Sequence, residues 1–290
     1  AGLCGSLGVL MWYVPAEEHP QVPRYMQEAE AACARALELA PDLADAHTMA
    51  AKLYTAQWQW ARAKPHYERA LALSPDDAEV HFNYSDWLAA TGRTDEALGA
   101  IRRAIALDPL VPIFLSQYGF LLNHTGRPHD AVMQFEAAYA LTPDVPLISR
   151  NLFQIYYQVG RIDDAEKLLD ATRAGEAARA KRLGIDRDVQ ATRRLAIRIA
   201  REPGQRDALI SRLDAAARDE IIYALPQGTD ELFGFVKARF DRNVTGPDEV
   251  ILLRISPQFA ALRGDPRYKQ LLVQAGFDEN GAVPAKAAPP

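Results

Sequence analysis

The sequence predicts an all-α solenoid, in which antiparallel helix pairs stack in sequence order. The first observation is a seven-residue phrase that ends in proline and returns every 34 residues: RALELAP at 35–41, RALALSP at 69–75, RAIALDP at 103–109 and the degraded AAYALTP at 137–143. The second is that apolar residues within each half-period recur at i, i+3, i+4 and i+7, which is one face of a helix. A unit of this size cannot bury its own apolar face, so we expect neighbouring units to stack.

Composition narrows the class of protein further. The chain has 290 residues, of which 49% are hydrophobic, and a net charge of −5. A buried core is therefore possible, and direct nucleic-acid binding is not expected, because such binding depends mainly on neutralising phosphates. The two cysteines, Cys4 and Cys33, are too few for a disulfide framework or a four-cysteine zinc site. We expect two buried thiols, with a disulfide between them as the alternative.

Residues 1–43 are predicted to form an irregular helical pair. Residues 24–41 have the pattern of a complete second helix, and 2–13 would be its partner across a loop that holds Pro15, Pro20 and Pro23. No apolar run reaches the roughly 18 residues that a membrane span needs. The nearest candidate, 2–14, lacks the basic leader and cleavage site of a signal peptide. The missing initial Met suggests a processed product or a piece of something longer.

The recurring proline sets a frame of four repeats, 44–77, 78–111, 112–145 and 146–179. Each feature of the frame has a physical role. Alanine at positions 20 and 27 lets two helices cross closely, a large apolar residue at position 24 fills the core, and a Gly-Arg pair forms the turn, since glycine takes the left-handed cap conformation cheaply. The proline ends the second helix. Trp58-Gln59 replaces the Gly-Arg pair in the first repeat.

Three positions depart from this frame. Pro65 lies inside a second helix, where it should kink the helix or delay its start. Phe153 stands where the other repeats have a small residue, and should overcrowd a regular fourth unit. Thr172 replaces the alanine of position 27.

Downstream, 180–278 keeps helical patterning but loses the period. We expect helices within 186–204, 206–228 and 229–243, then a short turn and a terminal helix from Pro266 that docks through Leu271, Leu272 and Phe277. This region would cap or fill the superhelix. Residues 279–290 are predicted to be a disordered tail.

The repeat features together resemble the tetratricopeptide repeat (TPR) family, which implies a right-handed α-α superhelix. The stretches WQWARAKPHYERAL, GRTDEALGAIRRAIALDP and SPQFAALRGDPRYKQLL also resemble the C-terminal repeat regions of bacterial multidomain signalling proteins. In those proteins a winged-helix DNA-binding domain, a class III adenylate cyclase or a protein kinase lies upstream. This resemblance implies a sensory or interaction module of a regulator.

Candidate chemistry is sparse. His47 and His81 share a frame position, but no third ligand accompanies them, so structural histidines are favoured over a metal pair. His124 and His129 flank a turn and should be solvated. The arginine-rich stretch 179–201 could bind an acidic partner, but a solvated helix face is the favoured interpretation. No metal, cofactor or catalytic residue is predicted.

The candidate site is the concave channel of the repeats. In this family, frame positions 2, 5, 9 and 12 of the first helices face inward. The partner-binding positions assigned on that basis are Thr48, Lys52, Glu79, Phe82, Asp86, Ser116, Phe120, Asn123, Arg150, Gln154 and Tyr157. Only Lys52 and Arg150 resemble a clamp for a terminal carboxylate, so an extended or helical peptide with apolar anchors fits better. Alternatively, some of these aromatic residues pack against the C-terminal helices.

We therefore expect a non-enzymatic interaction or scaffold module of a bacterial regulator, cytoplasmic, or periplasmic if its parent has an upstream membrane span. Its partner would be a protein or peptide. The alternatives are a homodimerisation module of the parent and, more remotely, a helical enzyme with a C-terminal site.

Overall fold

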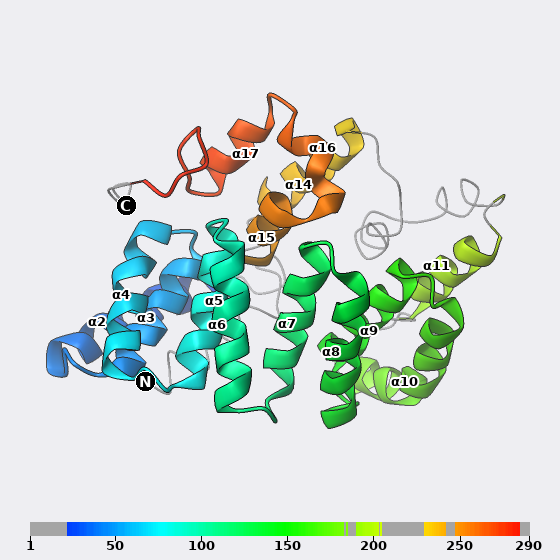
Figure 1. Ribbon diagram of the computed structural model, residues 1–290, viewed down its shortest axis with the longest axis horizontal. Coiled ribbons are helices and arrows are strands. Elements are labelled where there is room, and N and C mark those ends of the chain that lie inside the picture. Colours follow the sequence, from blue (N-terminus) through cyan, green and yellow to red (C-terminus); the bar gives the residue numbers. More distant parts are fainter. Residues whose placement is uncertain are drawn as a thin grey trace. The chain divides into compact units, whose positions relative to one another are not determined.

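The computed structural model describes residues 22–182, 184, 190–202, 204, 229–241 and 247–284 (Figure 1). All regular secondary structure in these ranges is helical, which confirms the predicted all-α class. No helix in these ranges combines the length and the apolar character that a bilayer crossing requires. The predicted helices at 2–13 and 206–228, and Cys4, lie outside the described residues.

The described residues divide between two compact units. Unit 1 combines the chain up to Pro109 with the chain from Gly228 onward, and unit 2 takes Leu110–Gln227. Each unit is described by itself below.

Unit 1 contains the N-terminal helices: α2 (Val22–Leu39), α3 (Ala44–Ala56), α4 (Trp60–Leu73), α5 (Ala78–Ala90) and α6 (Thr94–Leu107). Helices α3 and α5, each the first helix of its repeat, start at the predicted repeat boundaries. Consecutive helices pack against one another. The alanines of positions 20 and 27 are completely buried, as close crossing requires. Pro65 lies inside α4, but the helix start is not delayed, because Trp60 and Thr94 occupy the same frame position.

The repeat turns use the left-handed backbone conformation that the Gly-Arg pairs predict. Gly92 has φ +83°, and Trp58 takes the same role with φ +58°, the one non-glycine residue in the described ranges with positive φ. A bulky residue in this region is strained, so the exchange of glycine for Trp58 needs a compensating contact. The turn arginines pair with an acidic residue three positions later, as Arg93 does with Glu96 at 2.5 Å.

The C-terminal part of unit 1 consists of α14 (Thr229–Asp241), α15 (Pro247–Ile255), the 3₁₀ turn η4 (Pro257–Phe259), α16 (Ala260–Arg263) and α17 (Tyr268–Gln274). Leu271, Leu272 and Phe277 are buried, in agreement with the predicted docking. The terminal helix begins two residues after Pro266, because Asp265 accepts the Tyr268 and Arg267 N–H groups in a turn.

Two features of this region differ from the sequence-based expectation. Helix α15 was not anticipated as a separate element. Residue 279 is also too early a start for a disordered tail, because Asn280 and Ala282 donate backbone hydrogen bonds to Asp278 Oδ1, both at 2.9 Å. Residues 285–290 lie outside the described ranges.

Unit 2 contains α7 (Pro112–His124), α8 (Pro128–Leu141), α9 (Pro146–Gln158), α10 (Ile162–Arg182) and α11 (Ala191–Arg201). The first helices α7 and α9 again start at the predicted boundaries. Helix α10 continues past the end of its repeat, because Ala177 stands where the other repeats have proline. Phe153 is accommodated rather than overcrowded, since it is buried within the regular α9–α10 pair.

The departures after the fourth repeat serve the packing of α11 on α10. Gln190 Nε2 donates to Thr172 Oγ1 at 3.0 Å, which gives a reason for threonine in place of alanine. Arg193 pairs with Glu176 at 3.0 Å, and both side chains are about nine-tenths buried. The predicted solvated arginine face is therefore wrong at Arg193, which is part of the helix–helix interface.

Candidate functional site

The predicted binding positions lie on the first helices of the repeats, α3 and α5 in unit 1 and α7 and α9 in unit 2. On α3, Thr48 is buried and donates to Ala44 O at 3.0 Å, a bond within its own helix. Lys52 Nζ lies 3.3 Å from Glu79 Oε1 and so joins α3 to α5. Phe82 on α5 is half-buried. Lys52 is thus already engaged by a carboxylate of its own chain, which disfavours a role in a carboxylate clamp.

Asp86 on α5 is buried, with 1% of its surface exposed. Burial raises the pKa of its carboxyl group well above the ordinary value, and the nearby Asp248 raises that pKa further, while Lys52 lowers it. Asp248 lies in the first turn of α15, and α15 packs directly against α5. The chain's own C-terminal region therefore covers this part of the predicted groove.

Arg254, at the other end of α15, fixes this helix to α5. Its Nη2 donates to Thr91 O, the C-terminal cap of α5, at 3.2 Å. Its Nη1 donates to Gly281 O at 2.8 Å, and the guanidinium lies 4.4 Å from the centre of the Phe277 ring. Burial lowers the pKa of Arg254. The sequence offered one signal of this helix, the buried run Val-Ile-Leu-Leu after a proline and two acids.

A second contact joins the turn between α3 and α4 to the end of α17. Trp60 Nε1 donates to Ala275 O at 2.6 Å, and the Trp60 ring stacks on Phe277 at 5.4 Å between centroids. Trp58 packs on Phe240 of α14 at 4.9 Å. Gly276 has φ +82°, and a Cβ there would overlap Trp58 O. These contacts compensate the strained Trp58 backbone and explain why this repeat lacks the Gly-Arg turn.

In unit 2, polar side chains link the two first helices. Asn151 Nδ2 donates to Ser116 Oγ at 3.3 Å, and Asn123 Nδ2 donates to Gln158 Oε1 at 3.0 Å. Ser116 is buried, whereas Asn123 is only partly so. Both hydrogen bonds join α7 to α9, so they help to fix the distance between these two helices.

The remaining predicted positions of unit 2 keep part of their surface in solvent. Phe120, Gln154 and Tyr157 are half-buried, and Arg150 is exposed. Phe120 contacts the ring of His124 edge-on, with centroids 4.5 Å apart. His124 is itself 5% exposed, so the prediction of a solvated His124 is wrong: its place on the inner side of the last turn of α7 buries it, and burial lowers its pKa to about 3.

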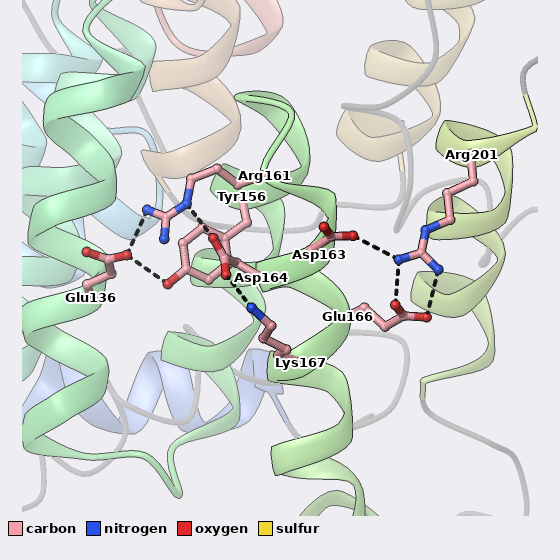
Figure 2. Close-up of polar contacts among 8 residues, drawn as sticks. All are labelled: Glu136, Tyr156, Arg161, Asp163, Asp164, Glu166, Lys167 and Arg201. Atoms are coloured by element: carbon pink, nitrogen blue, oxygen red, sulfur yellow. Dashed lines mark hydrogen bonds and ion pairs between the residues drawn. The ribbon is translucent and has the colours of Figure 1, made fainter.

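Figure 2 shows a polar network in unit 2 that joins residues of α8, α9, α10 and α11. Tyr156 Oη donates to Glu136 Oε1 at 2.9 Å, and Arg161 pairs with the same carboxylate at 2.8 Å and with Asp164 at 2.7 Å. Arg201 of α11 bridges two acids at the start of α10, Asp163 at 3.0 Å and Glu166 at 2.6 Å. Every charge in this view has an opposite charge beside it, which indicates a structural role rather than catalysis.

His47 and His81 of unit 1 likewise make hydrogen bonds within the fold. His47 Nε2 and His81 Nε2 lie 2.9 and 2.8 Å from Pro41 O and Pro75 O, the prolines that end the preceding repeats. Each carbonyl oxygen can only accept, so each Nε2 donates to it. His47 Nδ1 lies 3.0 Å from His66 Nδ1. Over the described part of the chain, no group of three or more metal-binding side chains occurs.

Comparison with known proteins identifies the class of fold. Residues 48–112 and residues 122–183 each match the tetratricopeptide repeat family. No protein of curated function matches the chain in sequence. Among solved structures, PilF of Pseudomonas aeruginosa is 20% identical, with 81% of this chain and 98% of that chain covered and a TM-score of 0.53. PilW, a widely conserved type IV pilus biogenesis factor, is 18% identical, with 81% of this chain and 99% of that chain covered and a TM-score of 0.54.

The protein therefore contains tetratricopeptide repeats in a helical solenoid, as the 34-residue period predicts. A repeat fold of this class supports a protein or peptide partner. At these identities the two solved structures show the fold alone.

Proposed function

We propose that the chain is a non-enzymatic interaction scaffold that binds a segment of a partner protein along the first-helix positions of its repeats. The observation that carries the proposal is the partial exposure of Phe120, Gln154 and Tyr157, together with exposed Arg150, on α7 and α9. Large aromatic and amide side chains that stay half in solvent on a rigid helical pair are suited to anchor an extended or helical peptide.

The kind of partner follows from the side chains that keep part of their surface in solvent. Phe120 and Tyr157 would bury apolar side chains of the partner, and Gln154 offers both a donor and an acceptor to its backbone. Arg150 would favour an acidic residue nearby. In unit 1, Glu79 and Phe82 occupy the corresponding frame positions, whereas Asp86 lies beneath the chain's own α15 and would not meet a partner in this state.

We further propose that the scaffold serves a bacterial regulatory protein. This context rests on the resemblance of three stretches, around 58–71, 92–109 and 256–272, to the C-terminal repeat regions of multidomain signalling proteins. In that arrangement the repeats would present the partner to an effector domain of the same parent.

The test is a binding experiment with the full chain as immobilised bait. Phe120→Ala with Tyr157→Ala should abolish capture of the partner, and Arg150→Glu should weaken it at least tenfold. Met133→Ala is the matched control, because Met133 is 65% exposed on the second helix α8 of the same unit. Far-ultraviolet circular dichroism should be unchanged in all three. Capture that survives both the aromatic and the Arg150 changes would refute the proposed surface.

A further inference from the structure

The surface of unit 1 made by α5 and the Trp58–Trp60 turn holds residues 247–284, hereafter the C-terminal segment. We infer that this is a helix-binding surface of the repeats and that the C-terminal segment is its detachable internal ligand, which excludes other partners while it is bound. The kind of partner that would compete for this surface rests on the proposed function. The reversible binding of the C-terminal segment to the repeats does not.

The contact has the composition of a recognition interface. Val250, Ile251 and Leu253 of α15 are at most 1% exposed, so their burial stabilises the docked segment. Directional bonds fix the two ends, from Arg254 to Thr91 O and from Trp60 Nε1 to Ala275 O. Both acceptors are backbone carbonyls. The repeats therefore recognise the arginine side chain of the segment and the position of its backbone at Ala275.

The register of α15 on α5 is set by the same anchors. Asp248 lies near Asp86, and Arg254 reaches Thr91. A competitor would therefore need an apolar helix with an arginine near its C-terminal end.

The burial of Asp86 opposes the closed contact and makes detachment accessible. Its carboxyl group is 1% exposed, and the nearby Asp248 of α15 makes the charged form of that group less favourable still. A buried acid beside another acid is costly, and it regains water when α15 leaves.

The path of the chain permits detachment without unthreading the repeats. Helices α2–α6 are continuous in sequence, whereas the C-terminal segment returns to them only after the whole of unit 2. The segment can therefore leave while every peptide link within the repeats is kept. Opening of such a separate structural element below the global unfolding free energy is the behaviour expected of a local cooperative unit.

Two indole protons provide a matched test in the wild-type full chain. Trp60 and Trp87 are 1% and 2% exposed, and both indoles donate to a backbone carbonyl. Trp87 bonds to Trp60 O within the repeats at 3.1 Å, whereas Trp60 bonds to Ala275 O in the C-terminal segment. Hydrogen exchange followed by NMR should show the Trp60 indole exchanging at least ten times faster than that of Trp87. Equal rates would overturn the inference, because the segment would then open only with the repeats.

A variant pair tests the cause of the difference. Gly276→Val should accelerate exchange at Trp60 at least tenfold further and leave Trp87 unchanged, because a side chain there overlaps Trp58 O. Gly264→Ala in the same segment should change neither, since its Cβ would meet nothing closer than 3.9 Å. Acceleration of both indoles to the same degree by Gly276→Val would contradict a detachable segment.

Discussion

Gly119 on α7 offers a quantitative test of how the repeats pack. It occupies frame position 8, and a Cβ built there would lie 3.1 Å from three atoms of the Phe135 ring. Ordinary contacts of this kind begin near 3.4 Å, so the ring must move by a few tenths of an ångström. Phe135 is 3% exposed in the core of unit 2, where side chains are closely packed and have little room to move.

The expected cost follows from two opposing effects. Alanine in place of glycine in a helix interior stabilises by about 1 kcal/mol. Overpacking of a filled core costs roughly 1–3 kcal/mol. Gly119→Ala should therefore change the free energy of unfolding by between about zero and 2 kcal/mol in the destabilising direction.

The matched control is Gly175→Ala in α10 of the same unit. No atom lies within 4 Å of a Cβ built on Gly175, so only the helix effect remains, and this variant should gain about 1 kcal/mol. Amide exchange in α8 measures the stability of unit 2 for both. A second control is Phe135→Leu, which should remove the overpacking cost of Gly119→Ala. The fourth repeat shows that a large residue at position 8, Phe153, is tolerated when position 24 holds leucine, Leu169. Equal stabilisation by Gly119→Ala and Gly175→Ala would refute the packing argument.

Two further predictions concern charge. The pKa of His124 is about 3 in the folded state, whereas the unfolded side chain binds a proton below about pH 6.5. Because the unfolded state binds the proton more readily, unit 2 should lose about 2 kcal/mol of unfolding free energy between pH 7 and pH 5. His124→Leu should abolish that slope in urea titrations, and exposed His129→Leu should keep it. Arg193→Ala should cost roughly 3–5 kcal/mol, because it leaves Glu176 buried without its counter-charge. Exposed Arg127→Ala should cost less than about 1 kcal/mol; equal costs would contradict the difference in burial.

The repeated part of the fold was predictable because its physical constraints repeat with the sequence. Proline at the end of each second helix and glycine at the turns act locally, so the helix starts at Ala44, Ala78, Pro112 and Pro146 follow from the frame alone. Trp58 shows the limit of this reasoning. The frame predicts its turn, but its strain is compensated by Phe240 and Gly276, about 180 and 220 residues away in sequence, and no local pattern carries that information.

The candidate site was less predictable for the same reason. Frame positions identify which side chains leave the first helices on one face, but whether that face meets solvent depends on what else the chain places there. Asp86 follows the frame and is nevertheless covered, because α15 supplies an apolar run and Arg254 from the far end of the chain. Phe120 and Tyr157 follow the same frame and keep part of their surface exposed. A repeat pattern therefore predicts where a partner could bind, and the non-repeating helices decide which of those positions are open.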